Sequence, residues 1–230
     1  MFFWRKKKED WVESPVHNNW YSASSYFLSS FALITTVNED GITSIGPYQL
    51  CFPFGVWERQ EWIVISRGGS NTSTNLKRRK KCALNFVEYD QGSLKDVIDL
   101  GYPEQDPEEK MKGCPLELEA TPTMTYREDP ERPKVISDAF QVFECELNDD
   151  PEKFHYDSAG ATEYLLLTIN HIHLREYWKK NLDLGGDMKI PKMPISYGFR
   201  NAKHFFFAQP KSAFWLPVST TAVKRLMRPK

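Results

Sequence analysis

The sequence predicts an all-β fold in which strands form a barrel and a few short helices flank it. Three stretches support this prediction. Residues 31–45 are typical of a β-hairpin, residues 82–87 alternate as a strand does, and residues 163–177 form the longest run of strand-forming residues. With 230 residues, the chain is long enough for one domain, or for one domain with an extension.

The composition is that of an ordinary globular protein, with 40% hydrophobic and 27% charged residues. The net charge of -1 gives no overall field that would attract nucleic acid or an acidic membrane surface. No apolar run approaches the ~20 residues of a membrane-spanning helix. The first residues, MFFWRKKKEDW, carry charge where a signal peptide has its apolar core. We therefore expect a cytoplasmic protein that binds neither nucleic acid nor membranes.

The four cysteines, Cys51, Cys82, Cys114 and Cys145, are widely separated and form no CxxC pair. A structural zinc site or a thioredoxin-like centre is therefore not expected. Cys82 and Cys145 lie in strand-like runs, where a free cysteine usually acts as a small buried hydrophobe. The sequence does not decide whether Cys51 takes part in redox chemistry.

Two further patterns have a structural explanation that we prefer. His171 and His173 form an HxH pair without a third ligand near them in the sequence, so no metal site is expected. The basic run at residues 77–81 lies between an apolar residue and a predicted strand. We interpret it as the solvated face of a helix rather than as a nucleic-acid patch.

The first hairpin ends in a segment that a ligand could approach. A turn at residues 38–41 separates its two strands, and the second strand resumes at residues 42–45. Residues 46–49 follow, and they include Pro47, which cannot donate to a β-ladder, so an edge or a bend is expected here. Either the backbone and the Gln49 side chain point at a ligand, or the strand simply ends.

A polar cluster follows the third predicted strand, at residues 61–66. It reads Arg67-Gly68-Gly69-Ser70-Asn71-Thr72, and a short helix at about residues 73–79 follows with Asn71 or Thr72 as its N-cap. First-turn N–H groups carry the positive end of the helix dipole, and arginine suits phosphate. We interpret the cluster as a phosphate site. A capped helix after a flexible loop explains these residues equally well when they are taken alone.

Neither GxxxxGK[ST] nor GxGxxG occurs in the chain, so a P-loop and a Rossmann site are both excluded. The order of the parts instead resembles that of the flavin reductase-like family with the FMN-binding split β-barrel. The resemblance covers about residues 30–177. The matching segments are residues 32–37 with Asp40-Gly41, Gly46-Pro47-Tyr48-Gln49, the strand that ends at Ser66, Thr72 with Asn75-Leu76, residues 82–87 and residues 109–114.

The resemblance implies a β-rich α+β chain folded as a Greek-key split β-barrel, usually a homodimer with FMN near the subunit interface. The phosphate would lie at Ser70–Thr72, and the isoalloxazine ring along Tyr48–Cys51 and Ser66. The implied cofactor-binding residues are Gly46, Pro47, Tyr48, Gln49, Leu50, Cys51, Ser66, Arg67, Ser70, Asn71, Thr72 and Asn75. The implied activity passes hydride from NAD(P)H through the flavin to an acceptor that the sequence does not identify. No catalytic residue is assigned.

Three positions differ from the residues that are common in this family. Glu163 stands where a histidine often opens the last long strand, Thr168-Ile169-Asn170 replaces glycine-glutamate-valine, and Gln49 replaces serine. Two alternatives therefore remain open. The first is a flavoredoxin-type electron carrier that does not react quickly with NAD(P)H, and the second is a barrel that binds a ligand without redox turnover.

Three parts of the chain are expected. Residues 1–29 form an N-terminal packing arm, and residues 30–178 form the FMN-binding split-barrel domain. After Trp178 the composition shifts, and residues 181–194 are rich in glycine and proline, which indicates a loop. Residues 179–230 are expected to form a C-terminal extension that covers the barrel or the dimer seam.

Overall fold

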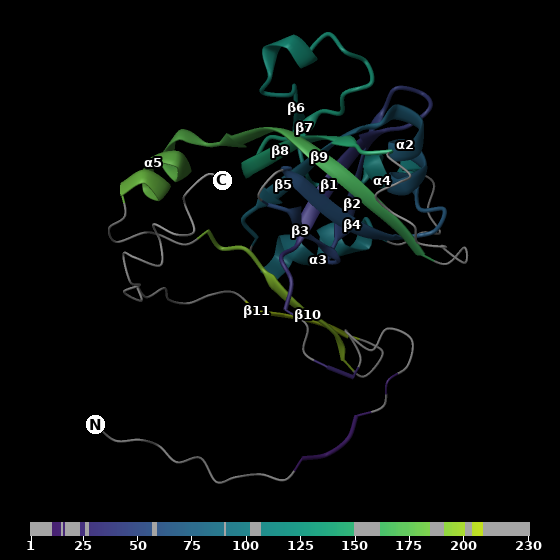
Figure 1. Cartoon of the computed structure of the whole chain (residues 1–230), viewed down its shortest axis with the longest axis vertical. Coiled ribbons are helices and arrows are strands. Elements are labelled where there is room, and N and C mark those ends of the chain that lie inside the picture. The colour runs from purple at the N-terminus through teal and green to yellow at the C-terminus, as the bar shows by residue number, and fades with distance from the viewer. Residues whose placement is uncertain are drawn as a thin grey trace.

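One curled antiparallel sheet forms the centre of the molecule (Figure 1). The computed structural model describes residues 11–14, 16, 24–25, 28–56, 59–89, 91–101, 107–149, 162–184, 191–200 and 204–208. The sheet has seven strands in the order β2-β1-β5-β8-β9-β4-β3. Their bounds are β1 Ala32–Val37, β2 Thr43–Tyr48, β3 Cys51–Gly55, β4 Glu61–Arg67, β5 Lys81–Val87, β8 Ala139–Leu147 and β9 Thr162–Leu174.

The two edge strands show why this sheet must curl. β2 and β3 lie at opposite edges, yet only Gln49 and Leu50 separate them in the sequence. A flat sheet of this size would place its edges about 29 Å apart, whereas such a link spans only about 11 Å. The edges therefore approach each other without pairing in the described ladders, which gives the predicted split barrel. Pro47 lies on the edge strand β2, as its missing N–H requires.

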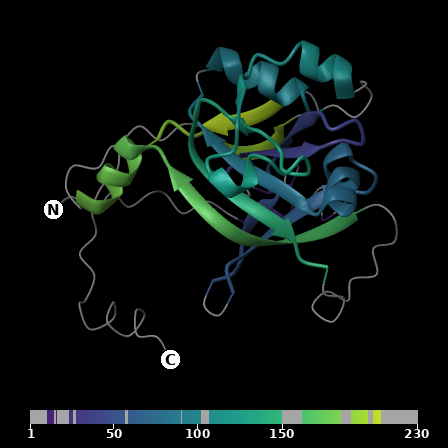
Figure 2. The ribbon, with the colours of Figure 1, turned by 90° about the horizontal axis from the view of Figure 1, so that it is seen from above.

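The longest strand, β9, makes the bend in the barrel. Its first half pairs with β4 from Glu61↔Thr168 to Arg67↔Thr162, and its second half pairs with β8 as far as Gln141↔Leu174. Figure 2 shows this strand curving along the barrel and leading into helix α5 (Glu176–Leu184). The predicted strand end at Tyr177 is therefore wrong. The last residues of that stretch are helical, and a Lys180–Glu176 ion pair one turn apart stabilises the helix.

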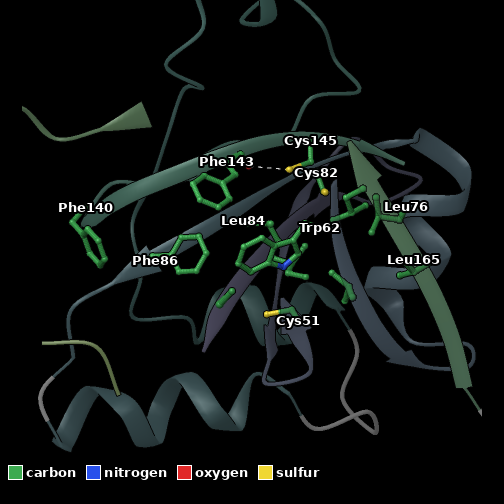
Figure 3. Close-up of a cluster of buried hydrophobic side chains, with 14 residues drawn as sticks. Cys51, Trp62, Leu76, Cys82, Leu84, Phe86, Phe140, Phe143, Cys145 and Leu165 are labelled. Atoms are coloured by element: carbon green, nitrogen blue, oxygen red, sulfur yellow. Dashed lines mark hydrogen bonds between the residues drawn. The ribbon is translucent and has the colours of Figure 1, made fainter. Parts of the chain in front are cut away.

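The inside of the barrel is filled by one apolar cluster to which nearly every strand contributes. Trp62, Phe86 and Phe143 meet edge to face at its centre, with the Phe86 and Phe143 ring centroids 5.2 Å apart (Figure 3). Side chains that alternate to the outer face form a second cluster with helix α3 (Gln91–Asp99) and strand β7 (Val135–Ile136). The sheet thus has two buried faces, which explains why β1 is buried throughout.

The remaining elements are short. They are α2 (Asn71–Arg79), α4 (Pro107–Lys112), the 3₁₀ turn Met124–Tyr126, the pair β6 (Leu118–Glu119) and β7 (Val135–Ile136), and the pair β10 (Ile195–Arg200) and β11 (His204–Ala208). Most of the predicted arm at residues 1–29 lies outside the described residues, as does much of the predicted extension. The helices described are all too short and too polar to cross a membrane.

The basic run of residues 77–81 ties the end of α2 to several loops. Each of its five cations has a carboxylate partner, and the pairs are Lys77–Glu163, Arg78–Glu39, Arg79–Glu131, Lys80–Asp149 and Lys81–Asp129. Lys81 is the most enclosed of these cations and also contacts Glu131 at 3.0 Å. The run is therefore a set of ion pairs that holds the chain together around α2.

The ion pair between Lys81 and Asp129 predicts that the protein loses stability at acid pH. Burial opposes the charge on Asp129, but hydrogen bonds from Lys81 and the Glu131 N–H outweigh it and lower the pKa of this carboxyl. Asp129 therefore contributes stability above its unfolded pKa of about 3.9 and loses it as the pH falls through the lower folded pKa. We expect Lys81→Met to lower the melting temperature at pH 7 by about 2–4 °C, equivalent to ~1 kcal/mol.

The difference between Lys81→Met and the unchanged protein is expected to shrink below about pH 4. Melting curves followed by circular dichroism between pH 3 and 8 measure it. Lys95→Met is the matched control, because Lys95 is 79% exposed and pairs only loosely with Asp99. A constant difference at every pH would contradict the role given to the Asp129 carboxylate.

Candidate functional site

A recess of about 100 Å³ opens where β2 meets the start of helix α2. Residues of the predicted site form much of its wall, namely Gly46, Pro47, Tyr48, Arg67, Ser70, Asn71 and Thr72. The rest of the wall comes from Ser44, Ile45, Gly69, Leu100, Gly101, Lys110 and Met111. The structure thus brings the bent end of the first hairpin and the polar cluster to one place, although residues 50–66 separate them in the chain.

Ser70 begins helix α2. Its backbone is extended, with φ -65° and ψ 150°, and its hydroxyl accepts a hydrogen bond from the Ser73 N–H at 3.1 Å. Gly69, with φ +70°, allows the chain to turn into this position. The predicted N-cap at Asn71 or Thr72 is therefore wrong. The helix begins at Asn71 instead, so the N–H groups of Asn71 and Thr72 are in the first turn and have no partner within the helix.

Three hydroxyl groups meet beside this cap. Tyr48 Oη lies 2.9 Å from Ser66 Oγ and 3.2 Å from Ser70 Oγ, and the two serine oxygens are 2.7 Å apart. The Ser66 hydroxyl also reaches the Arg67 carbonyl at 3.2 Å. Since the Ser70 oxygen already accepts from a backbone N–H, these hydroxyls satisfy one another. They fix the distance between β2, β4 and α2 and so shape the recess.

Thr72 differs from these hydroxyls. The residue is only 6% exposed and lines the recess, and its hydroxyl makes no hydrogen bond with any described residue. Because Thr72 lines the recess and its hydroxyl has no partner among the described residues, this hydroxyl can donate to a polar ligand atom there. The N–H groups of the first turn point to the same kind of ligand, an anion.

Gly46 lets β2 approach this hydroxyl. A Cβ atom at position 46 would lie 2.4 Å from Thr72 Oγ1, closer than real Cβ contacts allow.

We expect Gly46→Ala to displace Thr72 or the strand, to cost about 1–3 kcal/mol of stability by overpacking, and to weaken ligand binding at the recess. Chemical unfolding and FMN titration measure the two effects. At Gly113 an added Cβ would meet its nearest atom at 3.9 Å, so Gly113→Ala is the control. Unchanged stability and binding in Gly46→Ala would contradict the close approach.

The recess suits a negative charge. Arg67 and Lys110 both line it, and none of its lining residues is acidic. Burial lowers the pKa of the Lys110 ammonium, and the positive charge of Arg67 lowers it further. The two positive charges therefore repel each other within one small space. An anion bound between them would reduce this repulsion.

The other predicted site residues lie beside the recess. The Gln49 Nε2 atom is buried and has no hydrogen-bond partner in the described part of the chain. The Leu50 carbonyl accepts from the Ile65 N–H at 2.8 Å, which ties the link between the two edge strands to β4. The Asn75 side chain is buried and donates to Thr36 Oγ1 at 3.1 Å and to Ser44 Oγ at 3.2 Å, so it holds α2 against β1 and β2.

Cys51 places its side chain in the apolar interior of the barrel. Its thiol donates to the Tyr48 carbonyl at 3.6 Å. Burial raises the pKa of this thiol to about 12, despite opposing hydrogen bonds from Trp62 and the Ala32 backbone. The thiol is therefore protonated at neutral pH, and only the backbone of Cys51 remains to face a ligand.

Sequence patterns did not identify one part of the wall of the recess, which is formed by Leu100, Gly101, Lys110 and Met111. Residues 109–114 matched a family segment, but that match carried no role. Leu100 and Gly101 follow a helix without any local signal. Ser44 could have been found, because it lies two residues from Gly46 on the same strand and so shares its face.

The two strand histidines hold a loop onto the sheet. His173 Nε2 lies 3.2 Å from Glu144 Oε2 and 3.1 Å from Thr123 Oγ1, and His171 Nε2 lies 3.2 Å from Tyr126 Oη. In the described ranges no group of three metal-ligating side chains comes together. These contacts give the histidines a structural role in attaching residues 121–126.

Comparison by sequence gives a match over a small part of the chain. No family model matches the chain. A Bacillus subtilis (strain 168) protein called YdfE, which is uncharacterised, is 36% identical over 62 residues. That alignment covers 26% of this chain and 28% of YdfE.

Comparison by structure gives a consistent result. The 2-nitrobenzoate 2-nitroreductase NbaA of Pseudomonas fluorescens superposes with a TM-score of 0.63 at 18% identity, over 84% of this chain and 85% of NbaA. A split-barrel protein of Shewanella frigidimarina, assigned as a flavin reductase, gives 0.62 at 13% identity over 84% and 87%. Flavoredoxin of Methanosarcina acetivorans gives 0.62 at 12% identity over 94% and 100%. These matches confirm the split β-barrel fold.

Proposed function

We propose that this chain, which has the split-barrel fold of flavin reductase-like proteins, is an FMN-binding oxidoreductase. One observation carries the proposal: Thr72 is a buried residue that lines a recess at the N-terminus of α2, and its hydroxyl has no partner among the described residues. The proteins that share the fold support it, since they include a nitroreductase, a protein assigned as a flavin reductase and a flavoredoxin.

The residues of the recess fit the phosphate of FMN. The N–H groups of Asn71 and Thr72 would donate to phosphate oxygens, and the Thr72 hydroxyl would add a third donor. Arg67 balances the charge from the neighbouring wall. The hydroxyls of Tyr48, Ser66 and Ser70 keep these donors in place because they are bonded to one another.

The flavin ring would lie along the seam between β2 and β3. The backbone there is not engaged in a ladder across the seam, and the unpartnered Gln49 amide adds a donor. When bound, FMN would supply transfer of hydride or electrons from NAD(P)H to an acceptor. The protein's part is to seat the ring at this seam and to present backbone groups to its polar edge.

A flavoredoxin-type electron carrier is the second candidate, and Glu163 favours it. The family often has a histidine at this position, whereas Glu163 pairs with Lys77 and lies opposite Ser66 in the β4–β9 register. A carboxylate held by a lysine does not offer the neutral donor and acceptor of an imidazole. This difference supports a protein, rather than NAD(P)H, as the electron source.

A homodimer that shares the FMN site across its interface remains part of the proposal. Light scattering of the FMN-loaded protein tests it, and a monomer with FMN fully bound would refute a shared site. The cytoplasmic location expected from the sequence stays a prediction.

The absorption spectrum of the purified protein tests the main proposal. Bound FMN makes the protein yellow, and a chain that stays colourless after incubation with FMN and desalting would refute flavin binding and favour a non-redox barrel.

Anaerobic mixing with NADH or NADPH then separates the reductase from the electron carrier. Rapid bleaching supports the reductase, whereas a slow response together with rapid reduction by a reduced ferredoxin supports the electron carrier.

A further inference from the structure

Cys82 and Cys145 lie opposite each other inside the barrel. They are Cα partners in the antiparallel ladder of β5 and β8, although residues 83–144 separate them in the chain. Directly opposite partners place their side chains on the same face of a sheet. Both side chains are fully buried and belong to the apolar cluster that fills the barrel (Figure 3). The fold therefore brings together two thiols that the sequence predicted only as separate buried hydrophobes.

The geometry of this pair suits a disulfide. Partners in an antiparallel ladder have Cα atoms about 4.5–5.5 Å apart, which lies within the roughly 4.4–6.8 Å that a disulfide spans. The Cys145 thiol donates to the Phe143 carbonyl at 3.6 Å and also interacts with the Cys82 thiol. A bond between the two sulfur atoms therefore needs no change in the strand pairing.

The other two cysteines have no cysteine opposite them in the described ladders. Cys51 is as buried as Cys145, but its Cα partner is Val64 on β4. Cys114 packs against the second cluster, on the outer face of the sheet. Oxidation of the folded chain is thus directed to the pair of Cys82 and Cys145.

The surroundings of Cys145 set the rate of such a reaction. Burial raises the pKa of the Cys145 thiol, and the neighbouring Cys82 thiol raises it further, so this thiol is protonated at neutral pH and reacts slowly. However, the register of β8 and β9 shifts between Glu144 and Cys145. Such an irregularity disrupts the ladder locally. Local opening of the strands at this point gives a small oxidant a route to Cys145.

We propose that Cys82 and Cys145 form a disulfide in the folded protein when it is exposed to hydrogen peroxide, which joins β5 covalently to β8. In the first step one sulfur attacks the peroxide, the O–O bond breaks, and a sulfenic acid and one water form. In the second step the other sulfur attacks the sulfenic acid, the S–O bond breaks, and the S–S bond and a second water form. Two thiols and one peroxide thus give one disulfide and two waters. A dithiol reductant reverses the cross-link.

The test treats the reduced full-length protein with hydrogen peroxide in the absence of denaturant. The protein is then unfolded, its remaining thiols are blocked with N-ethylmaleimide, and its peptides are mapped by mass spectrometry. We expect a peptide pair that joins Cys82 to Cys145, with Cys51 recovered as a blocked free thiol. Because the bond closes the long loop of residues 83–144, the oxidised protein should melt roughly 5–10 °C above the reduced protein. Dithiothreitol should remove this gain.

Three variants make the result specific. Cys82→Ala and Cys145→Ala should each abolish the linked peptide and the gain in melting temperature. Cys51→Ala is the matched control, because it removes an equally buried thiol that has no cysteine opposite it, and it should keep both effects. The peptide map of the unchanged protein decides the question even if an alanine variant fails to fold.

The proposal is overturned if both thiols stay free after peroxide treatment, or if the disulfide joins other cysteines. A link between Cys82 and Cys145 that forms only in urea would also overturn it, because the folded barrel would then not direct the reaction. None of these measurements needs bound flavin. Their outcome is therefore independent of whether the proposed FMN site is correct.

Discussion

Replacing Thr72 with alanine is expected to weaken FMN binding by about ten- to a hundred-fold. The residue is 6% exposed, and its hydroxyl is a donor in the recess that makes no hydrogen bond with a described residue. Removing a donor to a charged phosphate oxygen costs roughly 1.5–3 kcal/mol, which gives this range. Quenching of flavin fluorescence during titration of FMN with the protein measures the dissociation constant directly.

Two variants make the Thr72 result specific. Thr72→Ser keeps the hydroxyl and should retain most of the affinity. Thr74→Ala removes a hydroxyl from an exposed position of the same helix, outside the recess, and should change nothing. An FMN dissociation constant that Thr72→Ala leaves unchanged would remove Thr72 from the site. Equal losses in both alanine variants would point to the helix rather than to the hydroxyl.

Replacing Asn85 with leucine is expected to cause a large loss of stability. Asn85 is fully buried, and its Nδ2 group donates to the Leu33 carbonyl at 3.0 Å and to Thr35 Oγ1 and the Ala83 carbonyl at 3.2 Å. Its Oδ1 atom accepts from the Ile136 N–H at 2.9 Å. Leucine has a similar volume but leaves these groups unpaired.

A buried donor or acceptor without a partner costs about 1–3 kcal/mol. For Asn85→Leu we expect a loss of about 3 kcal/mol in the free energy of unfolding, or about 6–12 °C in melting temperature for a chain of this size. Urea unfolding followed by tryptophan fluorescence measures it. Asn170→Leu places the same change at an exposed strand position and should stay within about 0.5 kcal/mol. If the two variants unfold alike, the Asn85 network does not hold β1, β5 and β7 together.

Local patterns in the sequence predicted the parts of the fold that depend on neighbouring residues. The hairpin of β1 and β2 follows from alternation and a glycine turn, and α2 follows from a cluster of polar cap-forming residues. The start of α2 was predicted too late because Ser70, Asn71 and Thr72 are all good caps. In the structure Ser70 is the N-cap, and its hydroxyl also contacts Ser66 on β4 and Tyr48 on β2.

Features that depend on contacts between residues far apart in the sequence could not be predicted from local patterns. The wall of Leu100, Gly101 and Lys110 is brought to β2 by the packing of α3 and α4, and no spacing along the chain encodes that packing. The end of β9 was misplaced because the aromatic residue Tyr177 follows the strand-forming run with no glycine or proline between them. In the structure α5 begins at Glu176. The meeting of β2 and β3 follows from the complete strand order, which a single sequence does not show.

The most direct test of the account is a crystal structure of the protein with FMN bound. We predict that phosphate oxygens lie about 2.7–3.1 Å from the N–H nitrogens of Asn71 and Thr72 and from the Thr72 hydroxyl, with the ring along the seam of β2 and β3. FMN bound elsewhere on the molecule, with no phosphate at the start of α2, would contradict it.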